Sequence, residues 1–339
     1  MIRSVKELDQ LLSEPSDRLI EDLSDLVGDI LILGVGGKMG PSLAALAQRT
    51  LNRTGSSGKV IGVSRFSGGN LQKQLEGQGI TTIQADLMNE KELDALPDVK
   101  NVIFLVGTKF GTSGNECFTW VLNSYLPGRV AEKYRNASIV AFSTGNVYPF
   151  TSVETGGPTE KDPVGPVGEY AQSCLGRERV FEYFSRKNKT PILIFRLNYA
   201  IDMRYGVLLE IAQSVYEGRP IDLKTGYVNV IWQGDANEIA LRCLKKCSSP
   251  PEILNVTGYD TVSVRWLGEQ FGKLLNRKPE FKNKEEPTAL LNNASKARRL
   301  FGDHNVSLSR MIDWTAEWVK NGGETHNKPT HFQERKGIF

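Results

Sequence analysis

Histidine is nearly missing from this chain. Three histidines occur among 339 residues, His304, His326 and His331, and all three lie near the C-terminal end. A metal centre built from several histidines is therefore excluded from the first half of the chain. Acid–base chemistry by histidine is excluded from that half as well.

Cysteine is also scarce, and its spacing gives no disulfide framework. The four cysteines are Cys117, Cys174, Cys243 and Cys247. Cys243 and Cys247 are four residues apart on an expected helix, a spacing that could hold a metal. Without a neighbouring histidine, two packed thiols are the better interpretation, and we predict no metal site. Free thiols favour a reducing compartment such as the cytoplasm.

The sequence lacks long apolar runs and a strong charge of either sign. Its longest apolar runs have the length of strands, so we expect no membrane-spanning segment. The first residues mix charges early and show no apolar core of a signal peptide, which favours a cytoplasmic location. The formal net charge is +3 and no basic run stands out, so nucleic acid is not expected as a partner.

Glycine is plentiful, and one cluster of it organises the first half of the chain. An apolar run, Ile30–Leu33, is followed by the glycine-rich stretch 34–40 and then by Leu43 and Leu46 at helical spacing. A strand, a glycine turn and a helix in this order predict a dinucleotide site. Glycines let the backbone approach a pyrophosphate, and the helix start offers free N–H groups to it. The alternative is a plain strand-to-helix turn.

Further strand-sized segments alternate with helical patterns along the chain. Strands are expected at 59–65, 79–87, 102–106, 138–142 and 191–198, with helices at 116–134 and 170–186. This alternation predicts an α/β fold with a doubly wound parallel sheet of the Rossmann type. Residues 1–28 read as one or two short helices packed against the sheet edge. The tail 321–339 reads as loosely ordered.

The ends of the second and third strands bear on cofactor choice. An acid after the second strand would bind a ribose 2′-hydroxyl and repel a 2′-phosphate, but here Ser64 and Arg65 stand in its place. Arg65 can pair with a phosphate, which favours NADP over NAD; the alternative is a solvated arginine. Asp86 could accept a hydrogen bond from the adenine amino group or could cap the following helix.

Several motifs then occur in an order typical of one family. They are Gly34-x-x-Gly37-x-x-Gly40, Ala85-Asp86-Leu87, the segment 142–148 (FSTGNVY), Thr159-Glu160 with Pro163, Tyr170, the segment 195–198 (FRLN), and the segment 255–258 (NVTG). In this order, from about residue 29 to 318, the chain resembles an extended, atypical short-chain dehydrogenase/reductase of the NAD-dependent epimerase/dehydratase family. The Arg–Asn spacing in 195–198 is one residue short of the family pattern.

The resemblance implies an architecture. It implies a Rossmann NAD(P)-binding domain over 29–200, to which strands at about 228–232 and 253–257 return. It also implies a smaller C-terminal substrate lobe over 201–320. Dimerisation through the helices at 116–134 and 170–186 is implied as well.

The resemblance also implies roles for individual residues. Thr144 would bind the reacting oxygen and Tyr170 would carry the proton, while a sugar or nucleotide-sugar substrate would contact Thr144, Asn146, Asn198 and Arg204. For Arg204, a surface salt bridge is an equal alternative. The expected cofactor contacts are Gly34, Gly36, Gly37, Lys38, Met39, Gly40, Ser64, Arg65, Asp86, Leu87, Val106, Gly107, Ser143, Tyr170 and Cys174.

One position departs from the family. The family helix reads Tyr-x-x-x-Lys, whereas Cys174 follows Tyr170 at the same helical face. The lysine would lower the pKa of the tyrosine and bind the ribose hydroxyls, and a neutral thiol does neither well. A free tyrosine with a pKa of about 10 is ionised in only about one molecule in a thousand at pH 7. Proton abstraction by Tyr170 should therefore be poor, and proton donation should suffer less.

Two other lysines could supply the missing cation. Lys109 follows the fourth strand at the ligand-binding edge of the sheet, and Lys38 lies in the glycine turn. The alternatives are that Lys109 caps a loop and that Lys38 is solvated. Cys174 as a nucleophile is disfavoured, because no histidine lies near it in the sequence.

Two hypotheses follow. The favoured one is an NAD(P)-dependent oxidoreductase or epimerase that uses Thr144, Tyr170 and Lys109. The other, motivated by Cys174, is a nucleotide-binding sensor or scaffold with little or no catalysis.

Overall fold

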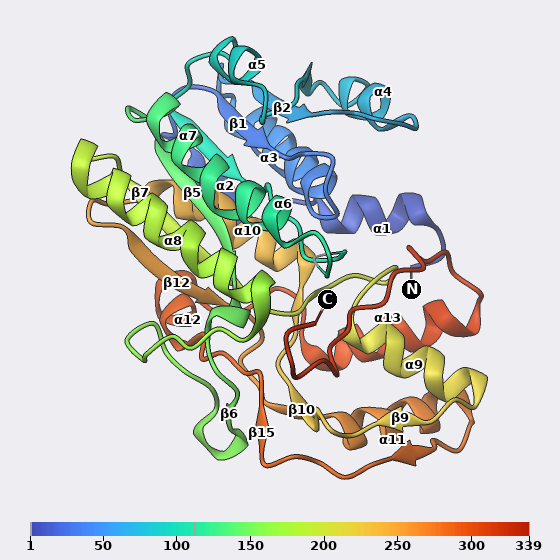
Figure 1. The fold of residues 1–339 in the computed structure, drawn as a ribbon. Coiled ribbons are helices and arrows are strands. Elements are labelled where there is room, and N and C mark those ends of the chain that lie inside the picture. Colours follow the sequence, from blue (N-terminus) through green and yellow to red (C-terminus); the bar gives the residue numbers. More distant parts are fainter. Residues whose placement is uncertain (1, 112, 339) are drawn as a thin grey trace.

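A seven-stranded parallel sheet forms the centre of the molecule (Figure 1). The computed structural model describes residues 2–111 and 113–338. The order of strands is β12-β7-β5-β4-β1-β2-β3, and every pairing between neighbours is parallel. The strands are β12 (Glu252–Val256), β7 (Ile192–Leu197), β5 (Ser138–Thr144), β4 (Asn101–Phe104), β1 (Ile30–Leu33), β2 (Val60–Ser64) and β3 (Thr81–Gln84). The Rossmann-type fold predicted from the sequence is confirmed.

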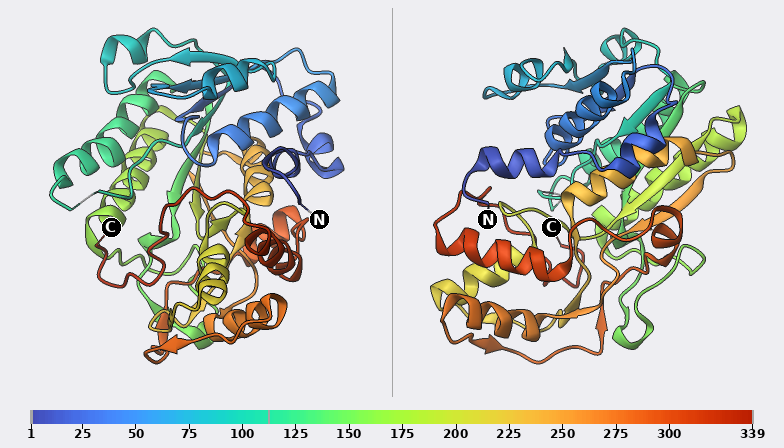
Figure 2. Two further views of the ribbon diagram at one scale, coloured as in Figure 1. Left: turned by 90° about the vertical axis from the view of Figure 1, so that its right-hand side faces the viewer. Right: turned by 180° about the vertical axis from the view of Figure 1, so that it is seen from behind.

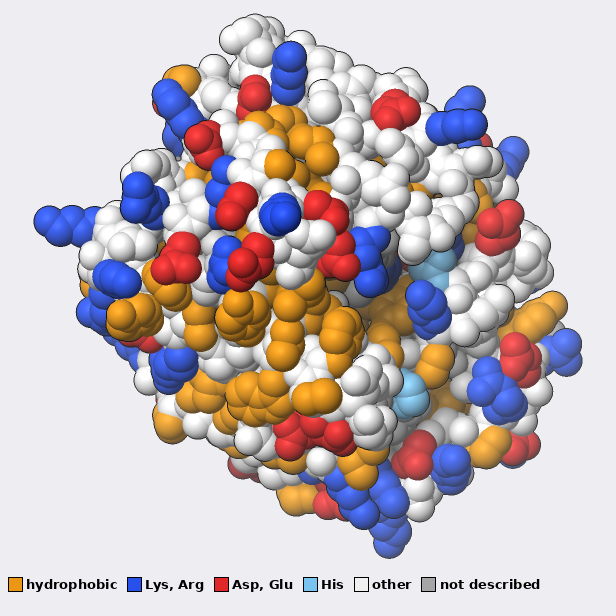
Figure 3. Space-filling model, turned by 45° about the horizontal axis from the view of Figure 1, so that its top comes forward, with side chains coloured by type: hydrophobic (Ala, Val, Ile, Leu, Met, Phe, Trp, Pro, Cys, Tyr) orange, Lys and Arg blue, Asp and Glu red, His pale blue; other side chains and the backbone are white. Residues whose placement is uncertain are grey.

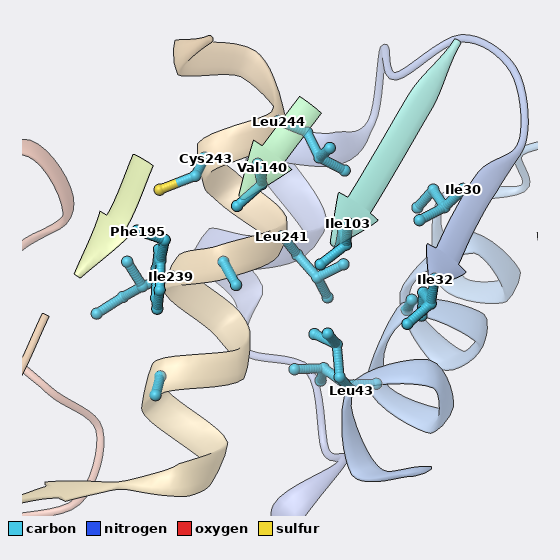
Figure 4. Close-up of a cluster of buried hydrophobic side chains, with 14 of the residues drawn as sticks. Ile30, Ile32, Leu43, Ile103, Val140, Phe195, Ile239, Leu241, Cys243 and Leu244 are labelled. Carbon is cyan, nitrogen blue, oxygen red and sulfur yellow. The ribbon is translucent and has the colours of Figure 1, made fainter. Parts of the chain in front are cut away.

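Helices cover both faces of this sheet. One face packs against α3 (Gly40–Thr54), α4 (Leu71–Glu76), α10 (Gln233–Arg242) and α12 (Ser295–Phe301). Figure 4 shows Leu43 and Leu241 meeting Ile30, Ile32 and Ile103 there. The other face packs against α5 (Glu90–Asp94), α7 (Leu126–Lys133) and α8 (Gly168–Asn188). Successive residues of a strand point to opposite faces, so a four-residue apolar run such as β1 serves both layers.

The expected helix at 116–134 contains a π-helical turn. It consists of α6 (Glu116–Trp120), η1 (Val121–Tyr125) and α7. Asn123 lies inside this turn, fully buried, and its side chain hydrogen-bonds both backbone groups of Thr108 at 3.0 Å. The turn thereby fastens the loop that follows β4.

The N-terminal helices do not lie at a sheet edge. α1 (Val5–Leu12) and α2 (Asp17–Leu23) pack on α3 and α10, in the helical layer. Leu19 and Leu23 join the core of the sheet, while Leu8 and Leu12 join a separate core in the C-terminal half. The expected position at the sheet edge is wrong, because these leucines find their apolar partners on helices.

The second core belongs to a smaller lobe. It gathers α9 (Val207–Glu217), α11 (Val264–Leu275) and α13 (Leu308–Lys320). Eight short strands form four two-stranded ladders: β6 (Thr151–Ser152) with β15 (Thr288–Ala289), β8 (Ala200–Ile201) with β11 (Ile231–Trp232), β9 (Ile221–Asp222) with β14 (Phe281–Lys282), and β10 (Tyr227–Val228) with β13 (Val262–Ser263). The short helical turns η2 (Gly145–Val147), η3 (Val153–Thr155) and η4 (Cys243–Lys246) complete the elements.

The segment 228–232 does not return to the central sheet. It is divided between β10 and β11, which pair with β13 and β8. The prediction of a sheet strand there is wrong, whereas 253–257 does supply the edge strand β12. An apolar run of this length serves a buried ladder as well as a central strand, so its pattern cannot distinguish them.

In its described part, which ends at residue 338, the tail after α13 contains no helix or strand, yet it is well packed. Phe332 is 3% exposed and belongs to the core of the smaller lobe. The Arg335 guanidinium donates to the Thr288 carbonyl at 2.8 Å and lies over the ring of Phe150. Figure 2 shows the tail running between the two lobes.

A buried ion pair connects α8 to the sheet. The Arg196 guanidinium on β7 donates to the Glu178 carboxylate on α8, with the shortest N–O distance at 2.6 Å. Ser143 on β5 donates to the same carboxylate at 2.5 Å. Arg196 also donates to the Tyr148 hydroxyl at 2.6 Å. Both partners of the pair are almost fully buried.

We predict that Arg196→Met destabilises the protein by about 3–5 kcal/mol, because it leaves the Glu178 carboxylate buried without its counter-charge. Urea unfolding measures this loss. Arg186→Met is the matched control, since Arg186 pairs with Glu182 on the exposed side of the same helix and should cost about 0–1 kcal/mol. Equal losses for the two variants would contradict a stabilising role of the buried pair.

Candidate active site

The candidate site lies where the strand order reverses, between β1 and β4. Open parallel sheets bind ligands at the carboxyl ends of their strands at such a point. The glycine turn between β1 and α3 lines three cavities there, of about 1000, 360 and 510 Å³. Figure 3 shows the hollow on this side, with basic side chains and histidine at its rim.

The glycine turn is shaped for close approach. Gly34 has a φ of +88°, which side chains rarely adopt. A Cβ on Gly36 would meet the Ser64 hydroxyl, and one on Gly40 would overlap the backbone carbonyl of Val35. Pro41 stands in the first turn of α3, where its missing N–H costs little. The residues therefore fit a dinucleotide phosphate cradle.

The cavity of about 510 Å³ begins at this turn and extends past the ends of β2 and β3. Ser64, Arg65, Asp86 and Leu87 line it together with Val106 and Gly107. The Asp86 carboxylate accepts the N–H of Met88 at 3.0 Å, while Asn89 caps α5. Asp86 is therefore not the helix cap, and its side chain faces the cavity.

The cavity of about 360 Å³ contains the expected reacting pair. Thr144, Asn146, Tyr170 and Asn198 line it, with Lys38, Met39 and Lys109. The Thr144 side chain hydrogen-bonds the Tyr170 hydroxyl. Asn198 is held by Asn229 and by the Leu290 carbonyl, both at 3.4 Å. The structure thus brings together four side chains that the sequence placed in the site.

Burial raises the pKa of Tyr170 well above its usual range. Arg177 and the hydrogen bond between Thr144 and Tyr170 act in the opposite direction. Tyr170 therefore keeps its proton at neutral pH, and its hydroxyl is prepared to donate a proton rather than to remove one.

Arg177 is a further cation near Tyr170, and the sequence analysis did not identify it. It follows Cys174 by three residues, so Tyr170, Cys174 and Arg177 share one face of α8. Its guanidinium donates to the Phe142 carbonyl at 2.8 Å and to the Asn123 side chain at 2.7 Å. A Cβ on Gly107 would collide with it, so this glycine makes room for the guanidinium.

Lys109 reaches the reacting pair from the loop after β4. Its ammonium lies 5.9 Å from the centre of the Tyr170 ring, and it donates to the Thr330 carbonyl at 3.4 Å. Burial lowers the pKa of Lys109 to about 8, although Cys174 and Glu210 counteract this. Lys109 is therefore a cation beside Tyr170 up to mildly alkaline pH.

Lys38 crosses from the glycine turn to the other lobe. Its ammonium donates to the Ala200 carbonyl at 3.0 Å and lies 4.3 Å from the centre of the Tyr205 ring. Desolvation in the cleft lowers the pKa of Lys38 to about 8. Lys38 is thus not simply solvated.

Three expected site residues are used differently. The Ser143 hydroxyl donates a hydrogen bond to the Glu178 carboxylate. Cys174 is fully buried beside Val147 and Tyr148. Neither Ser143 nor Cys174 lines any of the three cavities. Burial raises the pKa of the Cys174 thiol, which keeps it neutral. Arg204 pairs with Asp9 at 2.8 Å and with Asp202 at 3.3 Å, so the salt bridge is observed. It also lines the cavity of about 1000 Å³, and its contact with a substrate stays a prediction.

We predict that Gly40→Ala weakens dinucleotide binding and destabilises the fold by about 1–3 kcal/mol, because a new Cβ would push on the backbone of Val35. Calorimetric titration and thermal unfolding measure the two effects. Gly68→Ala is the control, since Gly68 lines the neighbouring cavity with open space around its Cβ position. A fully functional Gly40→Ala variant would argue against the close packing of the turn.

Solved structures of the same fold include three sugar-nucleotide epimerases. UDP-glucuronic acid 4-epimerase from Bacillus cereus in complex with NAD matches with a TM-score of 0.69 and 18% identity, covering 88% of this chain and 99% of that chain. UDP-glucose 4-epimerase from Thermotoga maritima with UDP-glucose matches with a TM-score of 0.70 and 16% identity, covering 87% and 99%. UDP-glucose 4-epimerase from Thermus thermophilus in complex with NAD matches with a TM-score of 0.69 and 16% identity, covering 87% and 99%. At such identities the likeness shows the fold.

No curated protein sequence matches this chain. A family model does match, over residues 30–230, which is more than half of the chain and includes the glycine turn, Thr144 and Tyr170. The expected family and the expectation of an enzyme family are thus confirmed, and the chain belongs to the NAD dependent epimerase/dehydratase family.

Proposed function

We propose that this protein binds a nicotinamide dinucleotide and catalyses hydride transfer on a sugar-type carbonyl or carbinol, with Tyr170 as proton donor and Lys109 as the cation that replaces the family lysine. The observation that carries the proposal is the position of Lys109. It reaches the face of Tyr170, and Tyr170 lies one helical turn before Cys174, which occupies the helical position of the missing lysine.

The cofactor fits the residues present. The glycine turn leaves room for a pyrophosphate, and the cavity beyond β2 and β3 has the volume and the polar side chains for an adenosine. Gly34, Gly36, Gly37 and Gly40 would hold the phosphates with Lys38 beside them. When bound, the nicotinamide supplies or accepts the hydride.

The chain's own residues then handle the proton and the substrate. As a carbonyl carbon gains a hydride, its oxygen becomes negative, and the Tyr170 hydroxyl gives its proton to that oxygen while the Thr144 hydroxyl hydrogen-bonds it. Lys109 stabilises the tyrosinate that results. Asn146 and Asn198 are placed to orient substrate hydroxyls. The high pKa of Tyr170 favours this reducing direction.

Arg65 supports a preference for NADP. Its side chain lines the adenosine cavity at the end of β2, where a 2′-phosphate would need a cation. Two of the structural matches described above are complexes with NAD, so the choice between the two cofactors requires a direct measurement.

The exposed aromatic side chains support a homodimer. Phe118, Trp120 and Tyr125 on α6 and η1, with Tyr183 on α8, are 38–59% exposed. Figure 3 shows apolar side chains gathered on this side of the molecule. A second copy would cover such a patch.

The cytoplasmic location also remains a proposal. All four cysteines are free thiols, which suits a reducing compartment. Among the described residues, no helix combines the length and the apolar character needed to cross a membrane, and no cluster of His, Cys, Asp and Glu suited to a metal occurs.

We expect Tyr170→Phe to lower kcat for carbonyl reduction by about 10²–10⁴-fold while cofactor binding persists, because only the donated proton is lost. Stopped-flow loss of NADPH absorbance measures it. Tyr183→Phe on the exposed side of the same helix is the control.

The second candidate function, a cofactor sensor, rests on Cys174; a wild-type protein that binds cofactor tightly but reduces no carbonyl would favour it.

The role of Lys109 adds a pH signature to the same assay. Lys109 is cationic below its pKa of about 8, so kcat should fall as the pH rises through about 8. The Lys109→Met variant should no longer show this fall in kcat above about pH 8. Its kcat should also be at least about tenfold lower than that of the wild type. Lys100→Met, at the opposite end of β4, should keep the wild-type profile. An unchanged profile in Lys109→Met would remove Lys109 from the mechanism.

For the cofactor, we predict that Arg65→Asp weakens NADPH binding by about 10–100-fold, because only NADPH carries the 2′-phosphate. NADH binding should be retained or strengthened, because an acid at this position can bind the ribose 2′-hydroxyl. Titrations that follow tryptophan fluorescence compare the two cofactors. Arg299→Asp, on the exposed side of α12, makes the same charge change as a control. A wild-type preference for NADH would contradict the role of Arg65, and binding of neither cofactor would contradict the proposed function.

A further inference from the structure

Two lysines span the cleft between the lobes. Lys38 extends from the glycine turn to the Ala200 carbonyl, and Lys109 extends from the loop after β4 to the Thr330 carbonyl. Both side chains line the 360 Å³ pocket that contains Thr144 and Tyr170, and both also line the cavity of 1000 Å³ beside α1 and α4. They therefore stand between the reacting pocket and the larger cavity.

The C-terminal tail, residues 324–338, forms another side of the same pocket. Thr330 lines it, and its N–H donates to the half-buried Glu210 carboxylate on α9. Its neighbour His331 lies with its ring centre 5.7 Å from that of Phe110, in the loop after β4. The tail thus contacts both lobes at the level of the reacting pair (Figure 2).

The tail is fixed on both sides of Thr330. Before it, the N–H of His326 donates to the Arg204 carbonyl at 3.0 Å. After it, Phe332 enters the core of the smaller lobe and Arg335 bonds Thr288 twice. Gly337 lies so close to Gly168 that a Cβ on either would overlap the other's backbone. These contacts hold the tail in place, so that it forms one fixed side of the pocket, called the wall below.

The volume of the pocket limits the size of the substrate. The pocket measures about 360 Å³, close to the lower end of the range of roughly 300–1,000 Å³ typical of small-molecule sites. Gly34, Gly37 and Gly40 are part of its lining, so a bound dinucleotide takes a share of the same space. The remaining room suits one sugar-sized molecule.

We propose that the C-terminal tail and the two lysines close the reacting pocket, so that the substrate is a free, sugar-sized carbonyl or carbinol with no nucleotide attached. The inference rests on the proposed function, whose substrate class it narrows. The Thermotoga maritima epimerase, solved with UDP-glucose, is covered over 99% of its length, but 87% of this chain is covered in return. This chain therefore has residues beyond the shared fold.

The experiment is a calorimetric titration of the full-length protein with UDP-glucose, with and without NAD. We expect no binding tighter than about 1 mM for the wild type. A chain that ends at Thr325 removes the wall and should gain at least about tenfold in affinity for UDP-glucose. Binding of UDP-glucose by the wild type in the micromolar range would overturn the inference. So would a folded, shortened chain that gains no affinity.

A point variant guards against misfolding of the shortened chain, which loses Phe332 from the core. Arg335→Ala removes the bonds to Thr288 and should raise the affinity for UDP-glucose in the same direction, by a smaller factor. Lys336→Ala, with an exposed side chain next to it, is the matched control and should behave as the wild type. Equal affinities in these two variants and the wild type would count against the tail as the wall.

The outcome is separable from the proposed function because the titration needs no turnover. Tight binding of UDP-glucose would refute the size restriction and leave hydride transfer standing. Failure to reduce any carbonyl would refute the proposed function, whereas the exclusion of UDP-glucose by the wild type and its recovery in the shortened chain would still hold.

Discussion

The buried pair between Glu178 and Arg196 sets the geometry on which the candidate site depends. It fixes α8, which carries Tyr170, against β7, and through Ser143 it also fixes β5, which carries Thr144. A charged pair without water is directional and is costly to break. The distance between the two reacting hydroxyls is therefore defined by a contact that lies away from them, further along α8.

Desolvation shifts the pKa values of the acidic and the basic side chains of the site in opposite directions. Desolvation raises the pKa of Tyr170 and lowers the pKa of Lys109. In the family pattern one lysine serves the tyrosine from the adjacent helical turn. In this chain the Lys109 ammonium reaches the Tyr170 ring from the loop after β4, and Arg177 lies two helical turns beyond Tyr170 on α8. Under the proposed function, the loss of the family lysine changes the source of the cation, while Thr144 and Tyr170 still line one pocket.

The sequence predicted the central sheet and much of the site because both depend on local patterns. Apolar runs, the glycine turn and the family motifs identify strands and the residues that follow them. Alternation along a strand could also have shown that Ser143 and Thr144 face opposite ways, and helical spacing beyond Cys174 could have found Arg177. The wall at Thr330 and the packing of α1 and α2 on other helices had no local signal, since they depend on contacts between distant segments.

The contact between Lys109 and Thr330 joins residues 221 positions apart. Synthesis proceeds from the N-terminus, and the Rossmann lobe, which includes β12 and α12, lies entirely before Thr330 in the chain. The pocket acquires this side only after Thr330 has been added. The fold of the first lobe and the shape of the site are therefore completed at different times in the life of each molecule, and only a chain that includes Thr330 has both.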